Sequence, residues 1–396
     1  MRYIILLYAI LNPMFFLCDV EPRDAQTLFY QISSMIVFGA SLFFENRATK
    51  RDPAHLWLGI MILCFLFAWG RSMAGFSQVL NFILGILVYL AVIRTLKAED
   101  FRFILKGVLG VTILSSAYLL AQKYLHYDLF GITNRASDII TYSSFFLQNS
   151  AMGMYHAQVM PLLMALSPIT AILAFPVMLS QSAGALLGAV AGTMFFLWFR
   201  KRVIFWIALL PIIAGIVFCV INPENLWSFK LRLPMWGMVA QDTLRNPLGY
   251  GFDEFADPKQ TGHWKYTRES YENAHITIKM IRQPDNRWVL SPNPSEEFLA
   301  RVKNQTSQLA EWDHPHNEYL WLGYEGGLAS LIPLGFIIYY VSQRFKRSKR
   351  EVETCALAGA LICVAACCVS QFYLHMARTA HLLPIMLGFF YLKTEE

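Results

Sequence analysis

Residues 313–328 read DHPHNEYLWLGYEGGL, and they join a long polar insertion to an apolar segment. Pro315 suits the first turn of a helix, where a backbone N–H has no partner to lose, so we expect His316 and Asn317 at a helix N-terminus. The positive end of the helix dipole favours a bound anion and a neutral imidazole there, and a neutral imidazole can accept a proton. His316 is therefore a candidate general base beside a phosphate site. The alternative that stays open is that His314 and His316 only cap a membrane helix at the water interface.

The composition is that of an integral membrane protein. Of the 396 residues, 56% are hydrophobic and 15% are charged, whereas about a quarter of the residues in soluble domains are charged. Helices that cross lipid satisfy their own backbone groups, whereas an open strand would leave polar backbone groups facing lipid. The first apolar run, residues 3–17, lacks the small residues that signal-peptide cleavage requires, so we interpret it as a membrane helix. The sequence predicts an all-α fold with about twelve spans, at residues 3–19, 25–44, 54–70, 76–95, 102–121, 150–166, 168–180, 183–199, 203–221, 317–341, 354–371 and 379–393.

The cysteines and the net charge exclude several classes of site. All seven cysteines lie in or at the ends of apolar segments and none lies in the polar insertion. A structural disulfide or a cysteine-based metal site in the insertion is therefore excluded. The net charge of +6 requires no nucleic-acid partner, because membrane topology accounts for where the basic residues lie.

Basic residues indicate the orientation of the chain. They concentrate in loops at residues 47–51, 94–102, 200–202 and 344–350. By the positive-inside rule these loops face the cytoplasm, both termini are cytoplasmic, and the insertion faces outward. The predicted parts are residues 1–221 with the first nine spans, residues 222–316 as a large periplasmic loop that carries active-site residues, and residues 317–396 with the last three spans.

Two further patterns involve glycine. Gly184, Gly188 and Gly192 recur every four residues, which is typical of a helix face that packs closely against another helix. In the insertion, residues 246–255 read NPLGYGFDEF, and Gly249 and Gly251 bracket a turn where the backbone can approach a ligand closely.

Three motifs, taken together, resemble those of the O-antigen ligase and polymerase family. They are an Arg four residues before a Trp, a Pro-Leu-Gly-x-Gly-x-x-x-Phe turn, and His-Asn-x-x-Leu entering a helix with Glu-x-Gly-Leu. That family includes O-linking oligosaccharyltransferases. The resemblance implies a GT-C-like fold in the bacterial inner membrane. It also implies a metal-independent glycosyltransferase, without a cofactor, that transfers a glycan from undecaprenyl diphosphate to a second glycan or to lipid A-core.

The resemblance assigns roles to particular residues. The family's arginine maps onto Arg232, which would bind the diphosphate, and its loop-closing histidine maps onto His316, which would act as base or orient the hydroxyl. Attack opposite the diphosphate would invert the anomeric centre. The other expected substrate-binding residues are His314, Asn317, Arg282, Arg287, Tyr319 and Trp236, where Arg282 and Arg287 are chosen by composition alone.

The chain also departs from the family pattern. Where many members read Ser-Arg-Gly-Ala before a membrane helix, residues 182–185 read Ser-Ala-Gly-Ala, and Ser330 replaces the ligase pattern's last glycine. These departures weaken an assignment to lipopolysaccharide ligase in particular. A metal shared by His314 and His316 has no third ligand at a recognisable spacing, so we expect none.

A rival hypothesis is a secondary transporter or lipid flippase with twelve spans. A transporter should place polar residues at mid-membrane and show repeat symmetry. The chemistry-bearing residues of this sequence gather instead in the outward insertion, and no repeat is evident. The sequence therefore favours the transferase.

Overall fold

The chain divides into two compact units in a computed structural model that describes residues 1–14, 22–44, 53–72, 76–126, 143–146, 149–180, 182–221, 227–251, 279–282, 288–291, 316–371, 374 and 377–395. Unit 1 comprises Met1–Leu63, Phe76–Trp206 and Ile332–Glu396, and unit 2 comprises Cys64–Gly75 and Ile207–Leu331.

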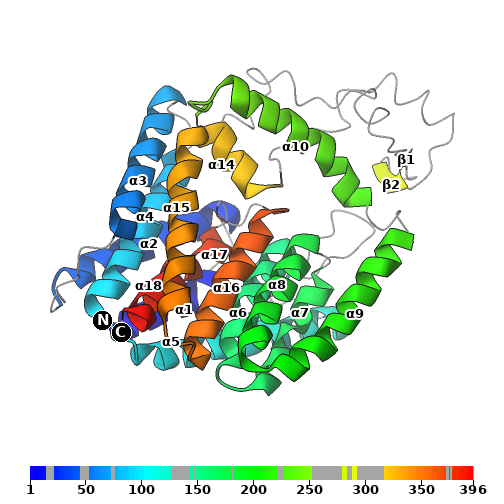
Figure 1. Cartoon of the computed structure of the whole chain (residues 1–396), viewed down its shortest axis with the longest axis horizontal. Coiled ribbons are helices and arrows are strands. Elements are labelled where there is room, and N and C mark those ends of the chain that lie inside the picture. The colour runs from blue at the N-terminus through cyan, green and yellow to red at the C-terminus, as the bar shows by residue number, and fades with distance from the viewer. Residues whose placement is uncertain are drawn as a thin grey trace. The chain divides into compact units, whose positions relative to one another are not determined.

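Helices make up most of the described chain (Figure 1). In order they are α1 (Arg2–Met14), α2 (Pro22–Ser41), α3 (Pro53–Ser72), α4 (Phe76–Thr95), α5 (Asp100–Tyr124), η1 (Ser144–Phe146), α6 (Asn149–Met164), η2 (Pro168–Ala174), α7 (Phe175–Leu179), α8 (Ala183–Arg200), α9 (Arg202–Ile221), α10 (Trp227–Arg245), α14 (Glu318–Gly326), α15 (Leu328–Arg347), α16 (Val352–Cys368), α17 (Ala377–Ala380) and α18 (Leu382–Thr394). A short antiparallel ribbon, β1 (Lys279–Arg282) and β2 (Trp288–Ser291), is an exception to the predicted all-α fold.

Most predicted spans coincide with a helix, and the span predicted at residues 76–95 has the bounds of α4. The seventh span, predicted at residues 168–180, is not a regular helix, because it consists of the 3-10 segment η2 followed by the five-residue α7. Two prolines explain the difference. Pro168 begins η2 and Pro176 lies in the first turn of α7, the helical positions where a missing backbone N–H costs least.

Four helices in the described part of the chain are long and apolar enough to cross a membrane, namely α4, α5, α8 and α15. Shorter apolar helices lie at Arg2–Met14, Ala54–Trp69, Pro168–Leu179, Val352–Cys368 and Leu382–Thr394. Large apolar side chains such as Leu63, Leu114 and Ile172 are exposed on unit 1, as suits a surface that faces lipid. The chain thus has the helices of a membrane-embedded protein, while the number of twelve spans stays a prediction.

The glycine face of α8 packs against α16 in unit 1, as the spacing predicted (Figure 1). A Cβ atom added to Gly192 would lie 2.5 Å from the carbonyl oxygen of Gly359, and one added to Gly188 would lie 2.8 Å from the carbonyl oxygen of Cys363. The two helix backbones therefore approach more closely than any larger residue permits.

We expect Gly192→Val to destabilise unit 1. The new side chain would meet the Gly359 backbone, which cannot rotate away, so the cost should be about 2 kcal/mol or more. Thermal unfolding in detergent measures the change. Gly110→Val on α5 is the matched control, because a Cβ atom there meets nothing within 4 Å. Equal unfolding temperatures for the two variants would contradict the close packing.

Contacts join three of the four basic loops at one end of unit 1. Glu353 at the start of α16 binds the side chains of Arg102 and Lys393, and the Arg200 guanidinium donates to the carbonyl oxygen of Arg350 (3.0 Å). The fourth loop, residues 47–51, lies outside the described residues. These contacts agree with the prediction that the basic loops share one side.

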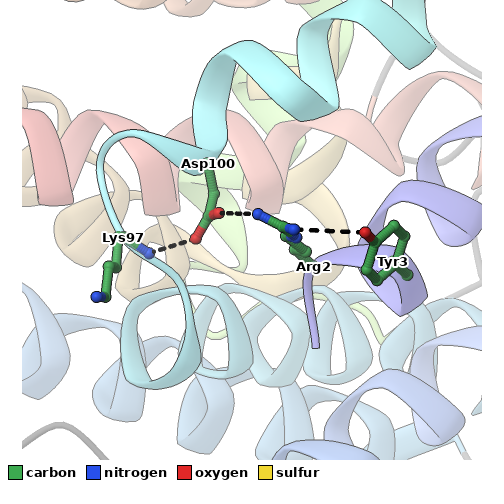
Figure 2. Close-up of polar contacts among 4 residues, drawn as sticks. All are labelled: Arg2, Tyr3, Lys97 and Asp100. Atoms are coloured by element: carbon green, nitrogen blue, oxygen red, sulfur yellow. Dashed lines mark hydrogen bonds and ion pairs between the residues drawn. The ribbon is translucent and has the colours of Figure 1, made fainter.

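The N-terminus belongs to the same end. Figure 2 shows the Asp100 carboxylate between two partners. One oxygen accepts from the backbone N–H of Lys97 (2.9 Å), and the other lies 3.8 Å from a guanidinium nitrogen of Arg2. Arg2 also donates to the hydroxyl of Tyr3 (3.3 Å). This ion pair ties α1 to the start of α5, beside the basic loop at residues 94–102.

Candidate functional site

The helix that follows His316 begins with an asparagine cap. Asn317 has an extended backbone, and its side-chain oxygen accepts the backbone N–H of Leu320 (3.1 Å). His316 has a φ angle of 48°, in the left-handed region. The predicted helix N-terminus is therefore confirmed, since α14 begins at Glu318. Pro315, on which the prediction was based, lies outside the described residues. The side chain of Asn317, not a proline in the first turn, marks the start of this helix.

Asn317→Ala should lower the stability of the α14 N-terminus by about 1 kcal/mol, because the Leu320 amide loses its acceptor. Asn317→Asp keeps an acceptor oxygen and should retain the stability. Hydrogen exchange at the Leu320 amide is the readout. Unchanged protection in the alanine variant would show that the cap contributes nothing.

The predicted span at residues 317–341 is wrong as a single helix. It breaks at Gly327, which has a φ of 75° and separates α14 from α15. Ser330, the departure from the ligase pattern, bridges the break, because its hydroxyl lies 2.9 Å from the carbonyl oxygen of Leu322 and 2.7 Å from that of Gly327. The side chain thus links the C-terminal half of α14 to the first turn of α15 across the break.

The break exists because a second segment of unit 2 binds there. The backbone N–H of Tyr250 donates to the carbonyl oxygen of Tyr324 (2.9 Å), and that of Gly251 donates to the carbonyl oxygen of Glu325 (3.0 Å). In the other direction, the N–H of Leu328 donates to the carbonyl oxygen of Pro247 (2.8 Å). We call residues 246–251 and 324–328 the clasp. It joins the Pro-Leu-Gly-x-Gly turn to the helix after His316.

Glycine is required on both sides of the clasp. Gly249 has a φ of 79°, and a Cβ atom there would overlap the backbone at Glu325 and Gly327. A Cβ atom on Gly327 would lie 2.5 Å from the carbonyl carbon of Leu248. The close approach predicted at Gly249 is therefore real, but its partner is the chain's own backbone rather than a ligand.

Arg232 and Trp236 lie one turn apart on α10, a helix that the sequence analysis did not predict inside the insertion. Both side chains are half-buried. Burial lowers the pKa of the Arg232 guanidinium from its usual value. The group nevertheless keeps its charge at neutral pH, so removal from water increases its attraction for an anion.

α10 packs against α14 within unit 2 (Figure 1). A Cβ atom on Gly323 of α14 would lie 3.3 Å from the methyl group of Thr243 on α10. Arg232 precedes Thr243 by about 16 Å along its helix, and His316 precedes Gly323 by about 10 Å. Each candidate residue thus precedes, in its own segment, the point where α10 and α14 meet. That Arg232 and His316 lie close enough to bind one donor molecule stays a prediction.

The other candidates divide into three groups. Tyr319 is half-buried on α14, close in sequence to the cap. Arg282 ends β1 opposite Trp288 of β2, and only its backbone is described. His314 and Arg287 lie outside the described residues. Of the predicted substrate-binding set, the structure brings Asn317 and Tyr319 of α14 together with Arg232 and Trp236 of α10 in one unit.

Comparisons with protein-family models, curated proteins and solved structures find no match.

Within the described residues, no group of three or more His, Cys, Asp or Glu side chains is placed to hold a metal ion. The donors that unit 2 offers are instead a guanidinium, an imidazole and a capped helix N-terminus. These groups suit a phosphate and a reacting hydroxyl.

Two buried carboxylates of α14 were not among the predicted site residues. Glu318 and Glu325 are fully buried, although each stands in a helix with a mostly apolar sequence. An acidic residue inside an apolar helix is itself a functional signal, because burying a carboxylate is costly unless it is bound. That signal was present in the sequence beside His316.

A second polar cluster lies inside unit 1. His156 is fully buried on α6, and its Nδ1 lies 3.0 Å from the carbonyl oxygen of Leu173 while its Nε2 lies 3.0 Å from the hydroxyl of Ser115. Since a carbonyl only accepts, Nδ1 carries the proton and Nε2 accepts from Ser115. Ser144, with a φ of 52°, extends the chain of hydroxyls. The expectation that the chemistry-bearing residues gather only in the insertion is therefore wrong.

Proposed function

We propose that this chain is a membrane glycosyltransferase that moves a glycan from undecaprenyl diphosphate to an acceptor hydroxyl. The observation that supports the proposal most is the clasp, because it ties the Pro-Leu-Gly-x-Gly turn to the helix after His316. The turn follows α10 directly, so Arg232 and His316 both belong to elements held by the same backbone contacts. The resemblance to O-antigen ligases and polymerases rests on these same segments.

The chemistry assigns one task to each residue. Arg232 would bind the diphosphate through its paired N–H donors, which match phosphate oxygens. The acceptor oxygen attacks the sugar C1, the bond from C1 to the phosphate oxygen breaks, and the hydroxyl proton passes to His316. Diphosphate leaves with the negative charge that Arg232 stabilises, and attack from the opposite face inverts the anomeric centre.

The proposed setting is the bacterial inner membrane, with both termini in the cytoplasm and unit 2 carrying the site on the periplasmic side. The acceptor is either a second lipid-linked glycan, as in a polymerase, or lipid A-core, as in a ligase. The donor's polyprenyl chain lies among membrane lipids in both cases. Neither a cofactor nor a nucleic acid takes part.

Reconstitution into proteoliposomes tests the proposal. Undecaprenyl-diphosphate-linked glycan is supplied with lipid A-core or with excess donor alone, and the products are separated by mass and analysed by NMR for linkage. The proposal expects free undecaprenyl diphosphate and a longer or core-linked glycan in equal amounts. A wild-type protein that releases no undecaprenyl diphosphate with either acceptor would contradict it.

A second candidate function, a transporter or lipid flippase, is favoured by the buried cluster around His156 in unit 1. Ionisable and polar residues among apolar helices are typical of transport pathways. The same proteoliposomes distinguish the two functions. A transporter would move the lipid-linked glycan across the bilayer without breaking the bond between its sugar C1 and the diphosphate, and His156→Ala would reduce that movement.

A further inference from the structure

An aromatic pair stands on the clasp of unit 2. The rings of Tyr250 and Tyr324 are stacked, with centroids 4.5 Å apart and an angle of 18° between their planes. Tyr324 is buried with 1% of its surface exposed, whereas Tyr250 is half-buried. Tyr324 therefore stacks on one face of the Tyr250 ring, while part of the surface of Tyr250 stays exposed.

The clasp fixes the position of this ring. The Tyr250 N–H donates to the carbonyl oxygen of Tyr324, and glycines with positive φ flank it at residues 249 and 251. The backbone therefore cannot move without breaking the clasp. An aromatic ring held this way loses little conformational entropy when a ligand binds to it.

Two charged residues near the end of α10 precede Tyr250 closely in the chain. In the last turn of α10, the Asp242 carboxylate lies 3.4 Å from a guanidinium nitrogen of Arg245, whose side chain is 70% exposed. Burial raises the pKa of the Tyr250 hydroxyl, the Asp242 carboxylate raises it further, and Arg245 acts in the opposite direction. Both charges thus act on the hydroxyl of Tyr250. Asp242 is buried, with 7% of its surface exposed, so Arg245 is the member of this ion pair that a ligand can reach.

We propose that Tyr250 is a stacking platform for a saccharide ring of the transferred glycan, with the exposed Arg245 donating to its hydroxyl groups and Asp242 holding Arg245 in place. A pyranose ring presents weakly positive C–H groups on one face, which the negative face of an aromatic ring attracts, and hydroxyls around its edge. This inference rests on the proposed transferase function, and it assigns a binding site to residues outside the reacting centre.

The position on α10 also specifies the substrate class. Asp242 and Arg245 lie about 15 to 20 Å from Arg232 along the helix. A single sugar on the diphosphate would not reach from one to the other. The substrate is therefore an oligosaccharide, bound at Tyr250 remotely from the anomeric carbon that reacts, which is how binding energy away from the chemistry positions a substrate.

Binding measurements on the full chain in detergent test the platform. The probes are the oligosaccharide released by mild acid from the lipid-linked donor of the producing cells, and undecaprenyl diphosphate without a glycan. The variants are Tyr250→Leu, Tyr250→Phe and Arg245→Ala, and Leu248→Ala is the control because Leu248 is an exposed residue of the same turn. Arg245→Ala changes an exposed side chain, so it tests the site even where Tyr250→Leu fails to fold.

We expect Tyr250→Leu to weaken oligosaccharide binding about tenfold, which corresponds to about 1.4 kcal/mol. Arg245→Ala should weaken it severalfold, while Tyr250→Phe and Leu248→Ala bind as the wild type does. Binding of undecaprenyl diphosphate should not change in any variant. Wild-type oligosaccharide affinity in both Tyr250→Leu and Arg245→Ala would overturn the platform.

The two proposals fail in different ways. A wild type that binds the oligosaccharide through Tyr250 but transfers nothing would overturn the transferase and leave the platform standing. A wild type that transfers glycan with unchanged affinity in the Tyr250 and Arg245 variants would overturn the platform and leave the transferase standing.

Discussion

Replacing Gly327 by valine is expected to open the clasp and abolish glycan transfer. Gly327 has a φ of 75°, and its Cβ atom would lie 2.5, 2.6 and 2.8 Å from backbone atoms of Leu248, Pro247 and Gly249. A β-branched residue with this φ costs about 1–3 kcal/mol in strain alone. The overlap with the backbone adds to this cost, because rotation of the new side chain leaves Cβ in place.

Hydrogen exchange locates the effect of Gly327→Val. The amides of Tyr250, Gly251 and Leu328 donate the hydrogen bonds of the clasp, so they should lose their protection together. The helices of unit 1 should keep theirs. The transfer assay should show a loss as large as that of a direct active-site variant, because Arg232 and His316 lose their common support.

Gly237→Ala is the matched control for Gly327→Val. Gly237 lies within α10, where a Cβ atom meets nothing within 4 Å, and alanine forms helix better than glycine by about 1 kcal/mol. The control should keep full activity and equal or higher stability. A Gly327→Val protein with a protected Leu328 amide and wild-type transfer would refute the structural role of the clasp.

His316→Ala and Arg232→Ala should each lower the rate of transfer by about 100- to 10,000-fold, the range for loss of a general base or of an electrostatic clamp. Arg232→Lys keeps the charge but loses the paired donors, so its rate should fall between those of wild type and Arg232→Ala. Both alanine variants should keep the wild-type unfolding temperature, because each side chain is only half-buried.

The kinetic pattern separates the two roles. Arg232→Ala should weaken binding of undecaprenyl diphosphate itself, whereas His316→Ala should bind it normally and fail in turnover. Gln241→Ala on the exposed face of α10 is the control, with no change in either quantity. Full transfer by both alanine variants would show that the site assignment is wrong.

Apolar runs predicted helices well, because the hydrophobic composition of a segment is a local property that is enough to indicate a membrane helix. The range at residues 76–95 matches α4, and the range at residues 102–121 lies within α5. The glycine face of α8 was likewise predicted, since a spacing of four residues is a local property. The basic loops were predicted to share one side, and the contacts of Arg102 and Arg200 agree with this.

Long-range contacts caused the errors. Nothing within residues 317–341 requires a break at Gly327, because the segment that fills the break, residues 246–251, lies far away in the chain. α10 was missed for a different reason. Its sequence contains Pro234 and Gly237, which disfavour helix, and only packing against α14 offsets them.

The candidate site could be predicted only in part. The helix N-terminus at His316 and Asn317 was predicted, but from Pro315, whereas the side chain of Asn317 forms the cap. The stacked pair Tyr250 and Tyr324 was not, because stacking across the clasp depends on two segments that meet only in three dimensions. The roles of Arg232 and His316 came from a resemblance, and they stay predictions.

The most direct test of this account is an experimental structure of the chain with undecaprenyl diphosphate bound. We predict that the diphosphate lies about 3 Å from the guanidinium of Arg232. His316 should lie on the opposite side of the sugar C1 position, where the acceptor hydroxyl attacks. A diphosphate bound away from unit 2, or Arg232 and His316 too far apart to reach one donor molecule, would contradict the account.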